Sequence, residues 1–177
     1  MTYLVLLLLG VAAIWWWTSH VPVSPPQVPE LSARIPFPAI RLDDPGTAIA
    51  QLERKDEIVI PHEYATLIIK FPLTKPVTLA VTAPIEAGFT RAALVETICE
   101  QYENVYDIEE ATANVKPLPP EERARLGRNR TDGLYGIWGH DLPDLVLTAV
   151  HWTRKPDARV HIEPHVEPRP KPELPAA

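Results

Sequence analysis

The sequence predicts an α+β fold in which one long amphipathic helix packs on a mainly antiparallel sheet, preceded by an N-terminal transmembrane helix. Three patterns lead to this expectation: an uncharged apolar segment at the N-terminus, several β-branched runs of strand length, and one long segment with helical periodicity between those runs. Strands, one helix and then further strands along a chain indicate a sheet that the helix covers on one face.

The N-terminal segment has the length and composition of a membrane anchor. No side chain in residues 1–19 is ionised, and as a helix this segment would be about 28 Å long, close to the roughly 30 Å of a bilayer's hydrocarbon core. Trp15, Trp16 and Trp17 are expected at the membrane interface, where indoles favour the headgroup layer. We therefore predict a single-pass membrane protein, of undetermined orientation, that contacts the lipid bilayer through residues 3–19.

A cleaved signal peptide is the less favoured reading of this segment. No Lys or Arg precedes the apolar run, and bulky Trp residues or proline occupy most positions where cleavage needs small side chains. Only cleavage after Ala13 would be acceptable, and it would leave a very short apolar run. A buried helix of a soluble core is a third, weaker alternative.

Proline sets the predicted limits of the folded domain. Seven prolines occur from Pro22 to Pro45, so residues 20–54 are predicted to be a proline-rich spacer, with a short helix over 45–54. The α+β domain is expected over residues 55–165. Residues 166–177 are predicted to be a proline-rich disordered tail, because proline cannot donate to a β-ladder.

β-branched and aromatic residues mark the strands, and turn-forming residues separate them. The predicted strands are residues 58–60, 64–73, 77–83, 134–138, 145–153 and 159–163. The turn residues between the second and third runs predict a hairpin. The last two runs alternate in polarity and are predicted to pair as an antiparallel hairpin.

The long helix is predicted to begin at Thr90, whose hydroxyl can cap it, and to end before Lys116. Its apolar positions recur every four residues, and its opposite face is acidic. The apolar positions are Leu94, Ile98, Tyr102 and Tyr106, and the acidic ones are Glu96, Glu100, Glu103, Asp107 and Glu110. Cys99 lies on the apolar side and is interpreted as a buried structural thiol. A short helical turn is expected before Gly127.

Composition excludes several function classes. The 177 residues carry a net charge of −6, which argues against a nucleic-acid partner, because phosphate binding requires a basic face. The single cysteine cannot form an internal disulfide. No nucleophile motif or oxyanion signature is recognisable, and no cofactor is predicted.

The segment 131–147 contains the residues that come nearest to a catalytic constellation. His140 and Asp141, with Asp144 nearby, form a candidate acid/base pair, since an imidazole oriented by a carboxylate is a common proton shuttle. The favoured interpretation is structural: an aspartate caps a turn and the histidine is a buried hydrogen-bonding residue. We therefore predict no catalytic site, and keep His140, Asp141 and Asp144 as the alternative.

The same segment carries a family resemblance. The stretch from Tyr135 to Leu142, YGIWGHDL, followed by DLVL over 144–147 and preceded by the GFTRAALVETICEQY helix, resembles an uncharacterised family of small domains in large DNA viruses and some algae or plants. The resemblance covers roughly residues 64–153. It implies a shared fold and a viral or algal setting, and it transfers no catalytic residue.

Histidines near the C-terminus raise the question of a metal site. His161, Glu163 and His165 would point to one side of an extended strand, with His151 as a possible fourth ligand. Pro164 interrupts that strand and no cysteine pair supports the site. Polar residues on an exposed sheet face are the favoured interpretation, and no metal is predicted.

Four arginines form the basic cluster of the sequence: Arg123, Arg125, Arg128 and Arg130. Such a cluster suits an anionic partner, a lipid headgroup or an acidic protein, although it can also balance the acidic helix. Asn129 lies within it and begins an N-glycosylation sequon, Asn129-Arg130-Thr131, which matters only if the loop is luminal or extracellular.

The order of these parts predicts a membrane-anchored protein that displays a small, non-catalytic binding or scaffolding domain to a protein partner. The family resemblance would make it a viral membrane or virion component. The alternative is a membrane-tethered, hydrolase-like enzyme that uses His140 and Asp141.

Overall fold

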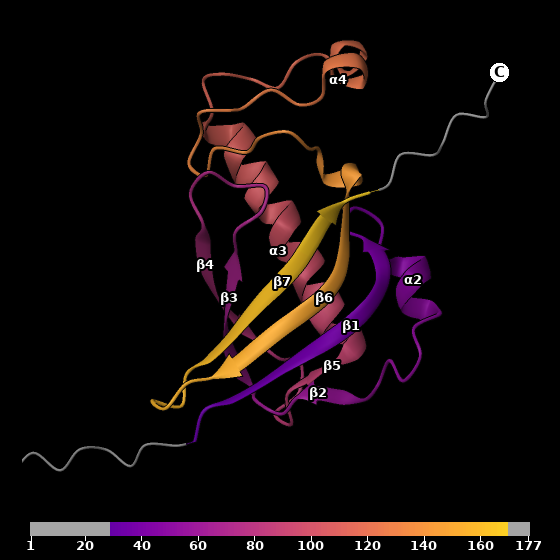
Figure 1. Ribbon diagram of the computed structural model, residues 1–177, viewed down its shortest axis with the longest axis vertical. Coiled ribbons are helices and arrows are strands. Elements are labelled where there is room, and N and C mark those ends of the chain that lie inside the picture. Colours follow the sequence, from indigo (N-terminus) through magenta and orange to yellow (C-terminus); the bar gives the residue numbers. More distant parts are fainter. Residues whose placement is uncertain (1–28, 170–177) are drawn as a thin grey trace, which may run out of the picture.

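The computed structural model describes residues 29–169, which form a five-stranded sheet, a two-stranded sheet and three α-helices (Figure 1). The large sheet has the order β1-β6-β7-β3-β4, and the small sheet pairs β2 with β5. The strands are β1 (Leu31–Arg41), β2 (Ile58–Ile60), β3 (Tyr64–Ile69), β4 (Val77–Thr82), β5 (Phe89–Thr90), β6 (Leu145–Arg154) and β7 (Val160–Pro168). The helices are α2 (Gly46–Ala50), α3 (Arg91–Thr112), α4 (Pro120–Leu126) and the 3₁₀ turn η1 (Leu142–Asp144).

The large sheet is antiparallel except where β3 and β7 meet. Thr66 and Leu67 of β3 lie opposite His161 and Ile162 of β7 in a parallel pair, while β1–β6, β6–β7 and β3–β4 pair antiparallel. The predicted hairpins β3–β4 and β6–β7 are confirmed. The parallel contact joins the two hairpins into one sheet.

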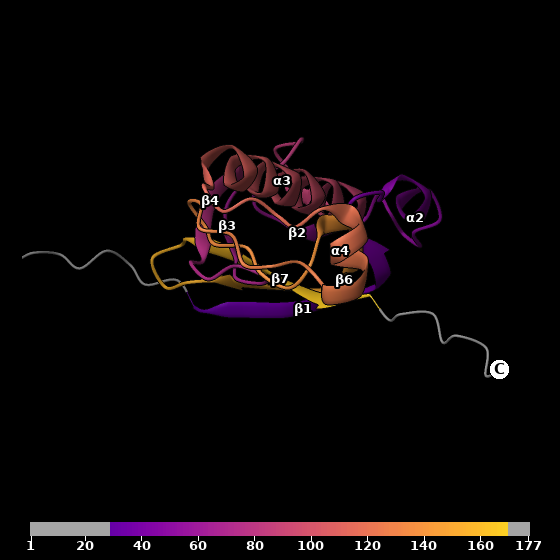
Figure 2. The same ribbon diagram turned by 90° about the horizontal axis from the view of Figure 1, so that it is seen from above.

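Helix α3 covers one face of this sheet, as the view from above shows (Figure 2). Thr90 caps the helix by accepting a hydrogen bond from the Ala93 amide at 3.1 Å, as predicted. The apolar positions predicted for the helix are buried, and the acidic ones are exposed.

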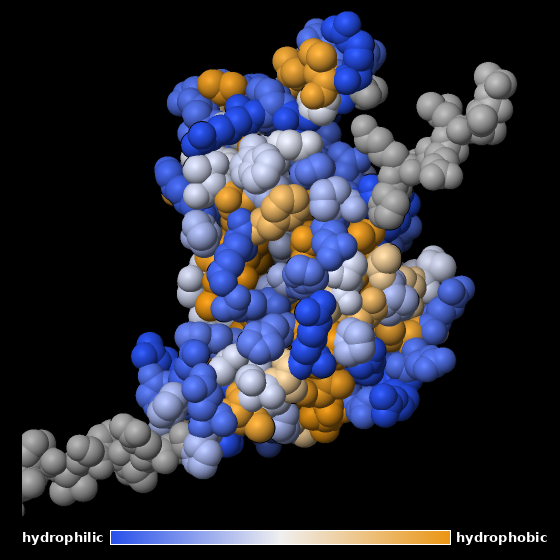
Figure 3. Space-filling model, viewed as in Figure 1, coloured by the Kyte–Doolittle hydropathy of each residue, from blue (hydrophilic) through white to orange (hydrophobic). Residues whose placement is uncertain are grey.

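Side chains of the sheet complete the core. Leu67, Ile162 and Trp152 lie opposite one another on adjacent strands, so they share the face that α3 covers, and all three are buried. Fully burying an aliphatic side chain of this size contributes about 1.5 to 3 kcal/mol. The other face of the sheet bears polar residues such as Thr66, His151 and Glu163, and it looks toward the viewer in Figure 1 and in the space-filling view of Figure 3.

The predicted transmembrane helix is corrected by the structure. Within residues 29–169, no helix has the length and apolar character needed to cross a bilayer; the longest, α3, carries ionised side chains along one face. The fold is thus supported as α+β without that helix, and a single-pass membrane protein is not supported. The segment 1–19, including Trp15, Trp16 and Trp17, lies outside the described residues.

The prediction of a proline-rich spacer over residues 20–54 was wrong for residues 31–41, whereas α2 lies within the short helix predicted over 45–54. Residues 31–41 form β1, which pairs with β6 at the edge of the sheet. Pro36 and Pro38 are tolerated there because an edge strand has partners on one side only. Arg91 of α3 holds the strand by donating to the Pro36 carbonyl at 2.9 Å and lying 5.0 Å from the Phe37 ring centroid.

Two further boundaries differ from prediction because of proline and glycine. Residues 134–138 form no strand; they contact the segment before β4 through an isolated bridge between Ile137 and Leu73 and through separate backbone hydrogen bonds. The predicted tail begins too early, because β7 continues to Pro168. Beyond Ile162 this strand has left β3, so Pro164 and Pro168 face an edge without a partner strand in the described part of the chain.

Candidate functional site

A buried carboxylate organises the loop that follows α4. Glu109, near the C-terminal end of α3, is fully buried. It accepts hydrogen bonds from the Thr131 hydroxyl (2.5 Å) and from the amides of Gly133 (2.9 Å), Tyr135 (2.8 Å) and Gly136 (3.1 Å). One helix side chain therefore takes the place of the backbone partners that this irregular loop lacks.

These hydrogen bonds also decide the charge of Glu109. Burial disfavours the ionised carboxylate, but the hydroxyl and the three amides together outweigh burial and lower the pKa of Glu109 below its ordinary value. The group is held as a carboxylate because all of its close partners are donors.

The glycines of this loop are required by the close approach to Glu109. A Cβ at Gly133 would lie 2.6 Å from the Glu109 carboxyl carbon and 2.8 Å from its backbone oxygen. Gly136 has a φ of +67°, a left-handed conformation that side chains disfavour, and a Cβ there would lie 3.1 Å from Thr74. The glycine spacing noted in the sequence thus reflects packing around the carboxylate.

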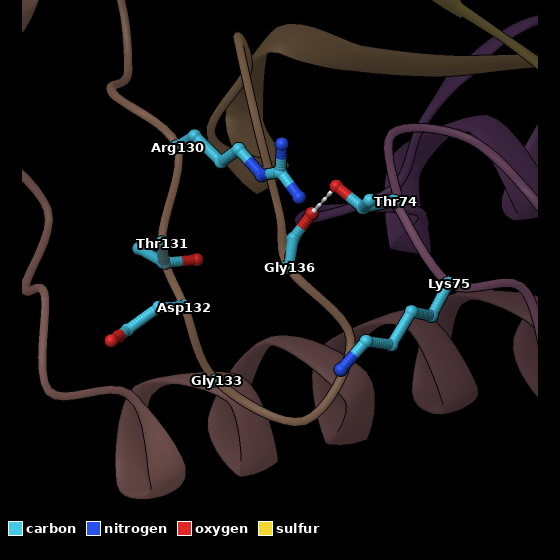
Figure 4. Close-up of a pocket in the computed structure, with 7 residues that line it drawn as sticks. All are labelled: Thr74, Lys75, Arg130, Thr131, Asp132, Gly133 and Gly136. Atoms are coloured by element: carbon cyan, nitrogen blue, oxygen red, sulfur yellow. Dashed lines mark hydrogen bonds between the residues drawn. The ribbon is translucent and has the colours of Figure 1, made fainter.

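The loop is fastened to the turn that leads into β4. The Thr74 and Lys75 amides both donate to the Tyr135 carbonyl, at 3.2 and 3.0 Å. The Thr74 hydroxyl donates to the Gly136 carbonyl at 2.7 Å. Between these segments lies a hollow of about 410 Å³ (Figure 4). It is lined by Thr74, Lys75, Arg130, Thr131, Asp132, Gly133 and Gly136.

Two cations border this hollow. In Figure 4 the guanidinium of Arg130 reaches toward Thr74, and the Lys75 side chain extends to the bend of the chain between Gly133 and Gly136. Within residues 29–169, neither Lys75 nor Arg130 makes an ion pair or a side-chain hydrogen bond. Their charges are therefore free to meet an anion.

The one carboxylate that lines the hollow is engaged elsewhere. Asp132 turns away from both cations in Figure 4, and it accepts hydrogen bonds from the amides of Asn114 (2.8 Å) and Val115 (2.7 Å). The hydrogen bond from Val115 contributes most to a lowered pKa of Asp132. Its carboxylate is therefore held by the amides that follow α3 and not by either cation.

The predicted arginine cluster divides into structural and free members. Arg123 and Arg128 both donate to the Asp141 carboxylate, at 2.7 and 2.5 Å. The Arg128 side chain is 1% exposed and lies 5.4 Å from the Tyr106 ring centroid. Arg125 is exposed on α4, and Arg130 lines the hollow. The structure therefore does not bring the four together as one binding surface.

Asn129 of the sequon is tied to neighbouring backbone. The side-chain oxygen of Asn129 accepts a hydrogen bond from the Leu118 backbone amide at 2.7 Å, and its side-chain NH₂ group donates to the Lys116 backbone carbonyl at 3.1 Å. In the folded domain this side chain connects the segment after α3 with the loop after α4.

The alternative catalytic residues have structural partners. The Asp141 carboxylate binds the two arginines, and the Asp144 carboxylate accepts from the Asp141 amide at 3.1 Å. His140 packs against Phe71 with ring centroids 5.6 Å apart. No hydrogen bond joins the side chains of His140 and Asp141, both of which the structure describes. The geometry that a proton relay requires is therefore not formed here.

The C-terminal histidines share the helix-free face of the sheet. His151 lies opposite Glu163, with His161 and His165 on the neighbouring pairs of the ladder. Glu163 binds Lys70 at 2.6 Å and His165 binds Glu167 at 3.0 Å. Among the described residues, no group of three or more potential ligands is arranged to hold a metal ion.

Sequence reasoning missed both Glu109 and Lys75. Glu109 had a usable signal, because it follows Tyr106 by three positions and therefore falls on the apolar stripe of α3, where a carboxylate needs donors. Lys75 had none, because its role depends on a contact between segments that are distant in sequence. Comparisons of the chain with protein families, curated proteins and solved structures find no match.

Proposed function

We propose that this chain is a non-catalytic binding domain that holds an acidic group of a protein partner in the hollow between Lys75 and Arg130. The observation that carries the proposal is the pair of cations without counter-charges beside a hollow of about 410 Å³. Carboxylates form charge-assisted hydrogen bonds with both kinds of side chain, and a guanidinium can bind a carboxylate through two parallel hydrogen bonds.

The surroundings support an external anion over an internal one. The nearby loop amides already donate to Glu109. The Asp132 carboxylate already accepts from two backbone amides. The loop itself is fixed to the turn before β4, so the backbone that carries the two cations is positioned before a ligand arrives. A prepositioned backbone loses less conformational entropy on binding than a mobile one.

A titration of the full-length chain with a blocked tetraglutamate peptide tests the proposal. We expect backbone amide resonances of Thr74, Lys75, Gly133 and Gly136 to shift in nuclear magnetic resonance spectra. The double variant Lys75→Gln/Arg130→Gln should bind at least about tenfold more weakly. Raising the salt concentration should weaken binding of the unmodified chain, because the contacts are exposed charges.

The matched control is Arg125→Gln, which removes an exposed arginine that does not line the hollow. This variant should bind the peptide with nearly unchanged affinity. Equal binding by the double variant and the unmodified chain would show that the acidic group docks elsewhere, and the proposal would then be wrong.

A further inference from the structure

The two edges of the large sheet differ in how they are protected. β1, at one edge, contains two prolines and a register shift between Pro36 and Ile40. β4, at the other edge, has the sequence Val-Thr-Leu-Ala-Val-Thr and pairs with β3 over its whole length without a shift. It carries none of the prolines, charges or bulges with which edge strands usually avoid pairing with another chain.

The hydrogen-bond phase of β4 shows which backbone groups face outward. The Ala83 amide donates to the Glu63 carbonyl at 2.7 Å, which continues the register of the β3–β4 ladder. In an antiparallel pair, residues that bond across the ladder alternate with residues whose amides and carbonyls point away from it. The outward-pointing residues of β4 are therefore Thr78, Ala80 and Thr82, and all three are exposed.

The free edge starts beside the cationic hollow. Thr74 and Lys75, which line the hollow, lie immediately before β4 in the chain, and their amides bind the Tyr135 carbonyl. A strand added antiparallel to β4 would run toward the hollow and bring its C-terminal residues near Lys75 and Arg130. Backbone pairing along the edge and a charge contact at its end would then act on one ligand.

We infer that β4 is a docking edge for an extended acidic peptide segment of a partner, which adds as a strand through Thr78, Ala80 and Thr82 and places a carboxylate between Lys75 and Arg130. Charge complementarity selects this occupant: the edge itself is uncharged, and the two lining side chains at its end without a described ionic partner, Lys75 and Arg130, are cations. The inference rests on the proposed function, because its charged contact is the same hollow.

The test compares blocked peptides on the full-length chain. Val-Thr-Val-Thr-Val-Glu-Glu should bind about tenfold more tightly than tetraglutamate and should slow hydrogen exchange at the Thr78, Ala80 and Thr82 amides. The reversed sequence, with glutamates at its N-terminus, should bind more weakly than the forward peptide. A forward peptide with alternate backbone amides methylated should fall to the affinity of tetraglutamate, because it cannot pair along the edge.

A protein variant gives an independent readout. Ala80→Pro removes an outward amide without removing a β3–β4 hydrogen bond, so it should lose the extra affinity for the forward peptide and keep the affinity for tetraglutamate. Ala80→Thr, which keeps the amide, is its matched control. If the proline variant does not fold, the methylated peptide still decides the question on the unmodified chain.

The outcomes separate the two proposals. One outcome would overturn strand addition and leave the hollow as the binding site. In it, Lys75→Gln/Arg130→Gln loses tetraglutamate binding, but the unmodified chain binds the forward peptide no more tightly than tetraglutamate. Protection of the β4 amides that appears without peptide and grows with protein concentration would also overturn it, since a second copy would then occupy the edge.

Discussion

Glu109 shows how one residue can determine the structure of a loop. Its carboxylate is the common acceptor of a hydroxyl and three amides from residues 131–136. The sequence marked this loop correctly as a place of tight turns, because its glycines are recognisable. It did not show what the turns surround, since the acceptor lies on a helix more than twenty positions earlier.

Replacing this carboxylate should destabilise the protein at neutral pH. In Glu109→Gln an NH₂ group would replace one of the two carboxylate oxygens and would face backbone donors. The free energy of unfolding should therefore fall by about 2 to 3 kcal/mol. Urea denaturation at neutral pH measures the loss. An exposed matched variant on the same helix, Glu103→Gln, should change the free energy by less than about 0.5 kcal/mol.

The pH dependence of stability has a definite sign. Folding lowers the pKa of Glu109 from its ordinary 4.5, so the carboxylate stabilises the fold fully above that value and progressively less as the pH falls through the folded pKa. The difference in unfolding free energy between the unmodified chain and Glu109→Gln should therefore shrink in acid. A difference that stays constant between neutral pH and roughly pH 3 would contradict a titrating role.

The cost of a methyl group at Gly133 is a second prediction at the level of single residues. Gly133→Ala would place Cβ against both the carboxyl and the backbone oxygen of Glu109, and should lower the free energy of unfolding by about 3 kcal/mol. Gly46→Ala is the control, because nothing lies within 4 Å of its new Cβ. Thermal unfolding of the two variants should show a large decrease for the first and almost none for the second.

At the scale of elements, Arg123 of α4 and Arg128 of the loop that follows it both bind Asp141, the residue that caps η1. Local patterns predicted α3, with its cap and its buried stripe, and both hairpins, because their signals lie within short stretches of sequence. β1 was missed because proline content indicates an extended spacer, whereas pairing at a sheet edge is decided by β6, far along the chain. The sequence did not predict a role for Lys75 either, because that role also depends on a segment far along the chain.

Removing the Asp141 carboxylate should be costly because it leaves Arg128 buried without its main counter-charge. We expect Asp141→Ala to lower the free energy of unfolding by about 3 kcal/mol, measured by urea denaturation. Asp157→Ala removes a carboxylate that pairs with Arg159 on the exposed β6–β7 turn, and should cost far less, because solvent screens that pair. Similar losses in the two variants would show that burial of Arg128 does not matter.

For the whole molecule, Cys99 is a built-in probe of the fold. Its thiol is buried on α3, where Cys99 faces the segment 42–45 that follows β1, and burial is the main cause that raises the pKa of Cys99 to about 12. The thiol should react with a disulfide reagent only when the domain opens. Its labelling rate should rise with urea along the global unfolding curve, and fast labelling of the native protein would contradict the observed packing.

The connectivity of the sheet has a consequence for synthesis on the ribosome. Leu31 of β1 pairs with Arg154 of β6, far along the chain. β3 pairs on its inner side with β7, which is the last strand of the described chain. Such non-local pairing gives the domain a high contact order, which slows folding. A nascent chain can form the β3–β4 hairpin and α3 early, but their apolar faces stay uncovered until β7 has left the exit tunnel. The incomplete precursors of the sheet are therefore the species most exposed to aggregation.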